Sequence, residues 1–143
     1  MQSREKHNLI IIRLFPKENI IHSLKTIAEK HHVSTAIILS GIGQIQNPTL
    51  GFFKAKGDYT SQTFNDIYEL LCLSGNIINN NNTYQPHLHA VISDEQKQTK
   101  GGHLINGLVS VTNEIVLLKT NIQTTRTISN ETGLADLTFT ENK

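Results

Sequence analysis

The sequence PHLHAVISDEQKQTKGGHLINGLVSVTNEIVLL at residues 86–118 decides the fold class of this chain. Two runs rich in Val, Ile and Leu, at residues 88–93 and 108–118, stand on either side of a polar segment at residues 94–100. Such runs, bounded by polar and glycine-containing turns, are typical of strands that follow one another in an antiparallel sheet. The stretch therefore predicts a sheet-rich domain.

The rest of the chain adds one helix and more strands. Residues 19–30 place apolar side chains on one helical stripe, which predicts a helix packed on the sheet. Glu18 is expected in the first turn of that helix, where a negative charge is favourable. Further strands are predicted at residues 8–14, 33–40, 50–53, 68–73 and 134–139. Turns are expected at residues 56–58, in the asparagine tract 79–82, and, as a turn or bulge, in SGIG at 40–43. The predicted class is α+β, mostly antiparallel, with one main helix.

Length and composition indicate one globular domain, 1–143, with a core at about 8–139. The chain has 143 residues, 37% of them hydrophobic and 17% charged. Lys plus Arg is 13 and Asp plus Glu is 12, which gives no electrostatic basis for tight binding to nucleic acid or membranes. The single cysteine, Cys72, excludes an internal disulfide and is expected in the core rather than as a nucleophile. With no signal peptide or membrane span in the sequence, a cytoplasmic location is expected.

Three histidines are the candidate metal ligands. His87 and His89 alternate along a predicted strand, so both imidazoles point to one face while Leu88 packs behind them. His103 follows two glycines that let the backbone approach closely. Three imidazoles and one open position form the usual reactive zinc site. The alternative is that this His-x-His pair binds nothing, as many isolated pairs do.

Two carboxylates, Glu69 and Glu114, lie within apolar strand-like runs. A buried carboxylate needs a partner, and each could orient a ligand imidazole from the second coordination shell. Exposure to solvent, or pairing with a lysine, explains them equally well. The glycines at 41 and 43 lack the rest of a dinucleotide-binding fingerprint.

Several segments together resemble the plants and prokaryotes conserved (PPC) domain family, from about residue 12 to residue 137. These segments are PHLH at 86–89, GGHL at 101–104, TNEI at 112–115, YELL at 68–71, LSGNI at 73–77, SGIG at 40–43 and TGL at 132–134. The resemblance implies an antiparallel sheet with a packed helix, assembled as a homotrimer. It also implies a metal, zinc before other divalent ions, held by His87, His89 and His103.

In plants, members of the family carry AT-hook segments and act as nuclear DNA-binding regulators that contact other transcription factors. This chain contains no Arg-Gly-Arg-Pro hook, and Lys17 stands where the family often has glycine before its helix. Binding to DNA is therefore expected to be weak or indirect. Two functions stay open. One is a metal-binding trimeric assembly or regulatory module; the other is a small zinc-dependent, hydrolase-like enzyme that acts on an unknown small molecule.

Overall fold

The computed structural model describes residues 1–139, which form nine strands and one helix. The helix is α1 (Ile20–Lys30). The strands are β1 (Gln2–Lys6), β2 (Leu9–Leu14), β3 (Thr35–Ala55), β4 (Asp58–Thr63), β5 (Ile67–Asn80), β6 (Thr83–Ser93), β7 (Thr99–Thr120), β8 (Thr124–Ile128) and β9 (Ala135–Phe139). The predicted class, a mostly antiparallel sheet with one helix, is confirmed.

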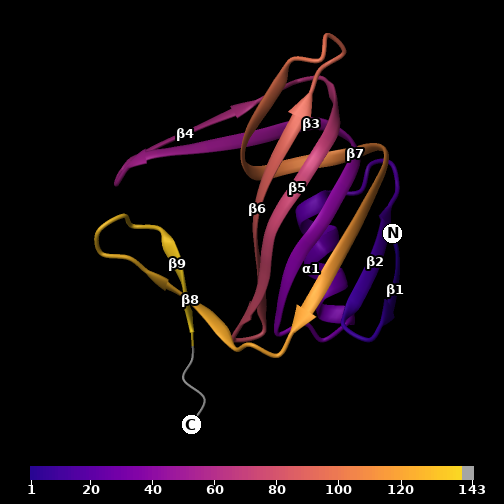
Figure 1. Ribbon diagram of the computed structural model, residues 1–143. Coiled ribbons are helices and arrows are strands. Elements are labelled where there is room, and N and C mark those ends of the chain that lie inside the picture. Colours follow the sequence, from indigo (N-terminus) through magenta and orange to yellow (C-terminus); the bar gives the residue numbers. More distant parts are fainter. Residues whose placement is uncertain (140–143) are drawn as a thin grey trace.

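The main sheet has the strand order β1-β2-β7-β6-β5-β3-β4, and all of its pairings are antiparallel. An additional pairing joins β7 to β3, so β3, β5, β6 and β7 form a closed ring of strands. The two longest strands, β3 and β7, curve strongly in Figure 1. This closure leaves an inner face, which holds the hydrophobic core, and an outer face.

Helix α1 covers the inner side because its apolar stripe is continuous. Ile20, Leu24, Ile27 and Ala28 are buried in the core. The helix begins after Asn19, whose side-chain oxygen accepts a hydrogen bond from the His22 backbone N–H at 3.0 Å.

Within residues 1–139, no helix combines the length and the apolar character that crossing a membrane requires.

Two local predictions, those for Glu18 and for Cys72, were wrong. Glu18 lies before the helix, and its carboxylate accepts a hydrogen bond from the Phe15 backbone N–H at 2.8 Å. At residues 40–43, where a turn or bulge was predicted, the structure has the bulge: β3 continues through them with register shifts. Cys72 is exposed, since the register shift between Leu70 and Cys72 changes the alternation of side chains along β5.

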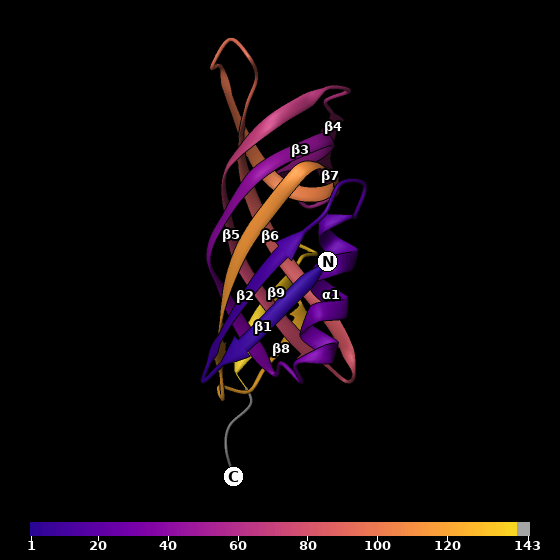
Figure 2. The same ribbon diagram turned by 90° about the vertical axis from the view of Figure 1, so that its right-hand side faces the viewer.

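Two arms project from the sheet on the side away from α1. One is the far end of β3 with β4, and the other is the separate hairpin β8–β9 (Figures 1 and 2). The arms meet at their tips, where the Lys56 Nζ donates a hydrogen bond to the Asn130 carbonyl oxygen at 2.7 Å. A buried hydrogen bond of 2.8 Å between the hydroxyls of Thr35 and Thr124 anchors β8 to the sheet. The arms thus arch over part of the outer face.

Gly75 gives a test of the sheet register. Its φ is +138°, and a Cβ there would lie 1.9 Å from the His87 carbonyl oxygen. We expect Gly75→Ala to lower the free energy of unfolding by more than about 2 kcal/mol, because backbone strain adds to a collision with the paired strand. Gly57→Ala is the matched control, since Gly57 has φ +82° but open space around it. Urea denaturation should show a loss of about 1 kcal/mol for the control; equal losses would contradict the steric argument.

Candidate metal site

The three predicted histidines lie together on the outer face of the sheet. His87 and His89 point outward from β6, and Leu88 between them is fully buried in the core. His103 of β7 is the direct cross-strand partner of His89. Side chains of cross-strand partners share a face of the sheet, so the register itself brings the third imidazole to the first two.

Gly102 helps to hold His103 in place. A Cβ on Gly102 would lie 2.9 Å from the Gly51 carbonyl oxygen, so the glycine lets β7 pass close to β3 at this point. Of the two glycines expected to permit a close backbone approach, Gly102 is therefore the one that does so. Gly101 has more room, because the nearest atom to a Cβ there would be 3.3 Å away.

The geometry of the cluster suits a metal ion. One ring nitrogen from each histidine lies within 4.8 Å of the others, and the ring centroids are 5.1–5.5 Å apart. Within residues 1–139, none of these three rings is engaged in a hydrogen bond with the protein. Zinc holds imidazole nitrogens at about 2.0–2.1 Å, so a small inward rotation of the rings is enough to ligate one ion. The donor set therefore fits zinc.

The surroundings favour neutral imidazole, the form that ligates a metal. Burial is the main cause that lowers the pKa of His87 below its usual 6.5, and the positive charge of Arg126 lowers it further. Burial also lowers the pKa of His103, with smaller contributions from His89 and Arg126. Both rings are consequently deprotonated at neutral pH and available to a cation.

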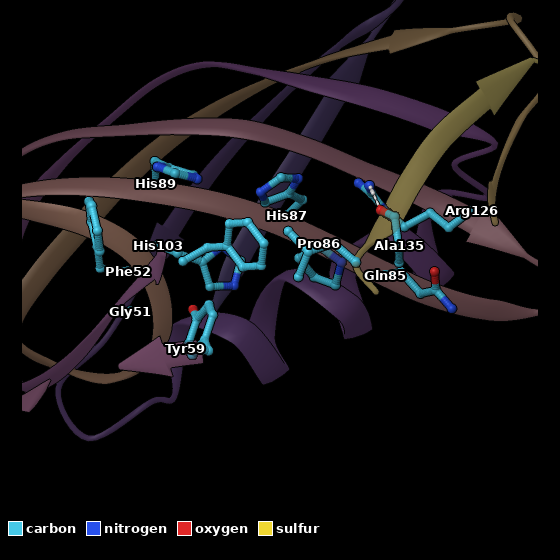
Figure 3. Close-up of a pocket in the computed structure, with 13 residues that line it drawn as sticks. Gly51, Phe52, Tyr59, Gln85, Pro86, His87, His89, His103, Arg126 and Ala135 are labelled. Atoms are coloured by element: carbon cyan, nitrogen blue, oxygen red, sulfur yellow. Dashed lines mark hydrogen bonds between the residues drawn. The ribbon is translucent and has the colours of Figure 1, made fainter. Parts of the chain in front are cut away.

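A cavity of about 670 Å³ opens over the histidines. Figure 3 shows residues that line it. Phe52, Phe53 and Tyr59 line it from the β3–β4 arm, and Arg126, Leu134 and Ala135 line it from the region of the β8–β9 hairpin. Gly51, Gln85, Pro86 and Gly102 complete the lining together with His87, His89 and His103. Burial raises the pKa of the Tyr59 phenol, which therefore stays protonated and can donate a hydrogen bond.

Arg126 lines the cavity, and sequence reasoning did not identify it. Its guanidinium donates hydrogen bonds to Asn76 Oδ1 at 2.6 Å and to the Ala135 carbonyl oxygen at 3.1 Å. Asn76 is the cross-strand partner of His87, so this contact holds the guanidinium close to the histidine cluster. A lone arginine in a threonine-rich tail gave no signal in the sequence, because only the return of β8 to the sheet places it at the site.

The structure does not bring Glu69 or Glu114 to the histidines. The Glu69 carboxylate accepts a hydrogen bond from Gln44 Nε2 at 2.9 Å, and its cross-strand partner is Ser93, four residues along β6 from His89. Glu114 lies on β7 between Arg13 of β2 and Ile42 of β3, eleven residues from His103. Neither carboxylate lines the cavity.

The family model of the Plants and Prokaryotes Conserved (PCC) domain, also called PPC, matches residues 1–121. The chain is also 33% identical over 107 residues to the bifunctional protein GlmU of Synechococcus sp. (strain JA-2-3B'a(2-13)). That match covers 74% of this chain but only 16% of the GlmU chain, so it concerns one segment of the larger protein.

Solved structures share the fold over nearly the whole chain. A candidate DNA-binding protein from Bacteroides thetaiotaomicron has a TM-score of 0.90 and 26% identity, with 96% of each chain covered. The PPC protein of Pyrococcus horikoshii has a TM-score of 0.83 and 26% identity, with 99% of this chain and 96% of that chain covered. A metal-containing protein from Archaeoglobus fulgidus has a TM-score of 0.82 and 22% identity, with 96% of each chain covered, a likeness that shows the fold alone.

The family assignment thus rests on two independent agreements. The family model covers residues 1–121, which include every strand of the main sheet and all three clustered histidines. The solved structures agree in fold over at least 96% of the chain. This chain belongs to the Plants and Prokaryotes Conserved domain family.

Proposed function

We propose that this protein is a metal-binding, trimeric assembly or regulatory module whose metal site lies at the base of a ligand cavity. One observation carries the proposal: three imidazole nitrogens lie within 4.8 Å of one another beneath a cavity of about 670 Å³. A cavity of 300–1,000 Å³ is the usual size for a small-molecule site.

The metal is proposed to be zinc, held by His87, His89 and His103. Imidazole is a borderline donor that suits zinc and also nickel, cobalt and copper. A relative with the same fold, from Archaeoglobus fulgidus, is a metal-containing protein, which supports the assignment. When bound, a zinc ion with three imidazole ligands supplies an open coordination position and acts as a Lewis acid.

The second candidate function is a small zinc-dependent, hydrolase-like enzyme. The cavity above the histidines favours it, because a substrate has room to approach the ion. A hydrolase of this type also uses a general base, commonly a carboxylate. Among residues 1–139 the cavity lining contains no Asp or Glu, whereas it contains an arginine and several apolar groups. This lining is better suited to holding a ligand than to activating water, so the module is the preferred function.

The trimer is supported by an outer apolar patch, formed by Leu9, Ile11, Ile37, Leu39, Val116 and Leu118. Leu118 of β7 pairs with Leu9 of β2 on one side and with Ile37 of β3 on the other, so these side chains form one row. Ile11 is 62% exposed and Leu39 is 54% exposed. A contiguous apolar surface of this kind is typical of an interface, and a closed cyclic trimer buries it symmetrically.

The patch continues toward the metal site. Ile37 pairs with Asn76 of β5, and Asn76 pairs with His87 of β6. A second copy seated on the patch therefore lies next to the histidine cavity, which links assembly to the site. This link supports a regulatory role in which ligand binding and self-association influence each other.

Contacts with DNA are proposed to be weak or indirect. A similar structure from Bacteroides thetaiotaomicron is a candidate DNA-binding protein, which connects the family to DNA-associated regulation. This chain has a formal net charge of only +1, and tight binding requires several basic groups at phosphates. We therefore propose that other regulatory proteins provide the contact with DNA. We also propose that the protein works in the cytoplasm.

The metal assignment predicts the effect of single histidine changes. Mutation of a residue that only orients a metal ligand lowers metal affinity roughly 10–100-fold. His89→Ala removes a ligand itself, so it should lower zinc affinity by at least about 100-fold. His22→Ala, at an exposed position of α1, should bind zinc as the parent does. Elemental analysis and competition with a fluorescent chelator measure both. Equal metal content in the two variants would refute the assignment, and no zinc in the reconstituted parent would refute the site.

The lowered pKa values of His87 and His103 predict the pH dependence of binding. Protons compete with zinc only near and below the imidazole pKa, and these two values lie below the usual 6.5. Zinc affinity should therefore stay nearly constant from pH 8 to 7 and fall steeply below about pH 6. Chelator competition at each pH measures this course. An affinity that already falls tenfold between pH 8 and 7 would contradict it.

The outer apolar patch predicts a variant that separates the subunits. The parent should sediment as a trimer at micromolar concentration, and Ile37→Lys should sediment as a folded monomer, because a charge cannot be buried unpaired in the interface. Ile128→Lys is the control, since Ile128 is 66% exposed on β8 and lies outside the patch. Circular dichroism checks the fold of each variant. A monomeric parent would refute the trimer.

A further inference from the structure

We propose that the cavity binds a small organic carboxylate, with the carboxylate held between Arg126 and the metal ion and its apolar part against the β3–β4 arm. This inference rests on the proposed metal site and adds the class of ligand. It assigns Arg126, Asn76 and the aromatic side chains of the arm to ligand binding.

Arg126 carries a positive charge that no carboxylate balances within residues 1–139. Its two acceptors, Asn76 Oδ1 and the Ala135 carbonyl oxygen, are both uncharged, and the ion pairs of the described residues do not include it. A guanidinium has five N–H donors, so three remain for a ligand. The side chain is half-buried, which strengthens its attraction for an anion relative to a fully solvated charge.

The remaining groups of the cavity make it selective for an anion. The charged and titratable side chains of the described lining are three imidazoles, one guanidinium and the Tyr59 phenol. Once a divalent ion is bound, the cavity holds two cationic centres, one at the histidines and one at Arg126. Arginine binds planar carboxylates through two parallel hydrogen bonds, and a metal ion accepts a carboxylate oxygen at an open position.

The apolar walls of the cavity favour a ligand in which the carboxylate is attached to an apolar group. Phe52 is 65% exposed, and Phe53, Pro86 and Leu134 line the same space. An inorganic anion would leave these surfaces in water. An aromatic ring would bury them, which favours binding by about 25 cal/mol per Å² of apolar area removed from water. In Figure 3, Phe52 and Arg126 lie on opposite sides of the histidines, so a ligand with an acidic end and an apolar end spans the site.

Arg126 lies beyond the segment matched by the family model, which ends at residue 121. The β8–β9 hairpin that carries it is joined to the other arm by the Lys56 to Asn130 hydrogen bond. The metal ligands thus come from strands β6 and β7 of the sheet, whereas the anion-binding group comes from the β8–β9 arm. A change in this arm would alter which ligand is accepted without disturbing the metal site.

The test uses benzoate as the probe and isothermal titration calorimetry on the zinc-loaded protein. We expect binding with a Kd of about 1 mM or tighter, in the range for a ligand of this size. Arg126→Gln should weaken it at least about tenfold, and Arg126→Lys should recover part of the loss because it restores the charge but not the planar fork. Arg4→Gln, at an exposed position of β1, should bind benzoate as the parent does. Benzamide, the neutral analogue, should bind at least about tenfold more weakly than benzoate.

The outcomes separate this inference from the metal proposal. Zinc binding without benzoate binding, or equal benzoate affinity in the parent and both Arg126 variants, overturns the carboxylate site and leaves the metal site standing. Tighter binding of inorganic phosphate than of benzoate overturns the choice of ligand class. If the parent takes up no zinc, benzoate is titrated into the metal-free protein. Weaker binding that still depends on Arg126 then supports the anion site alone, and no binding overturns it.

Discussion

Strand β7 pairs with three other strands, and the closed sheet depends on those pairings. Its first residues pair with β6, its last residues pair with β2, and β3 follows it along most of its length. Because β3 also pairs with β5, and β5 with β6, the ring closes and separates an inner core from an outer face. The same register sets His103 beside His89. The sheet that excludes water from the core therefore also assembles the histidine cluster.

The outer face combines three features that would be unfavourable in isolation: an apolar patch, clustered imidazoles and a guanidinium that no carboxylate of residues 1–139 balances. Each is explained by something that covers it. In the proposed function, a second copy of the chain would bury the patch, a metal ion would take the imidazole nitrogens, and an anionic ligand would neutralise Arg126. Asn76 connects all three, since it pairs with Ile37 and His87 and accepts a hydrogen bond from Arg126. These features are consistent with a module whose assembly and ligand binding depend on each other.

Local patterns predicted much of this structure, and the limits of that prediction are physical. The stripe of α1 and the alternation of His87, Leu88 and His89 depend on helix and strand periods, which the sequence carries directly. Glycines 41 and 43 were ambiguous because a bulge and a turn use the same backbone freedom. Alternation also gives only the face of a strand and not its partner, so the positions of Glu69 and Glu114 relative to the histidines followed only from the register. The site of Arg126 depends on a chain reversal that no local pattern encodes.

The closing strand has a consequence for synthesis and folding. Strand β3 begins at Thr35 but pairs with residues 103–120 of β7, so the ring cannot close until this late segment has left the ribosome. Until then β3 and β6 each expose an unpaired edge, and the chain is open to pairing with its neighbours. Contacts so distant along the chain also slow folding, because the entropy of a long loop is lost before the contacts stabilise it. We therefore expect emerging chains of this protein to be most open to aggregation before β7 is complete.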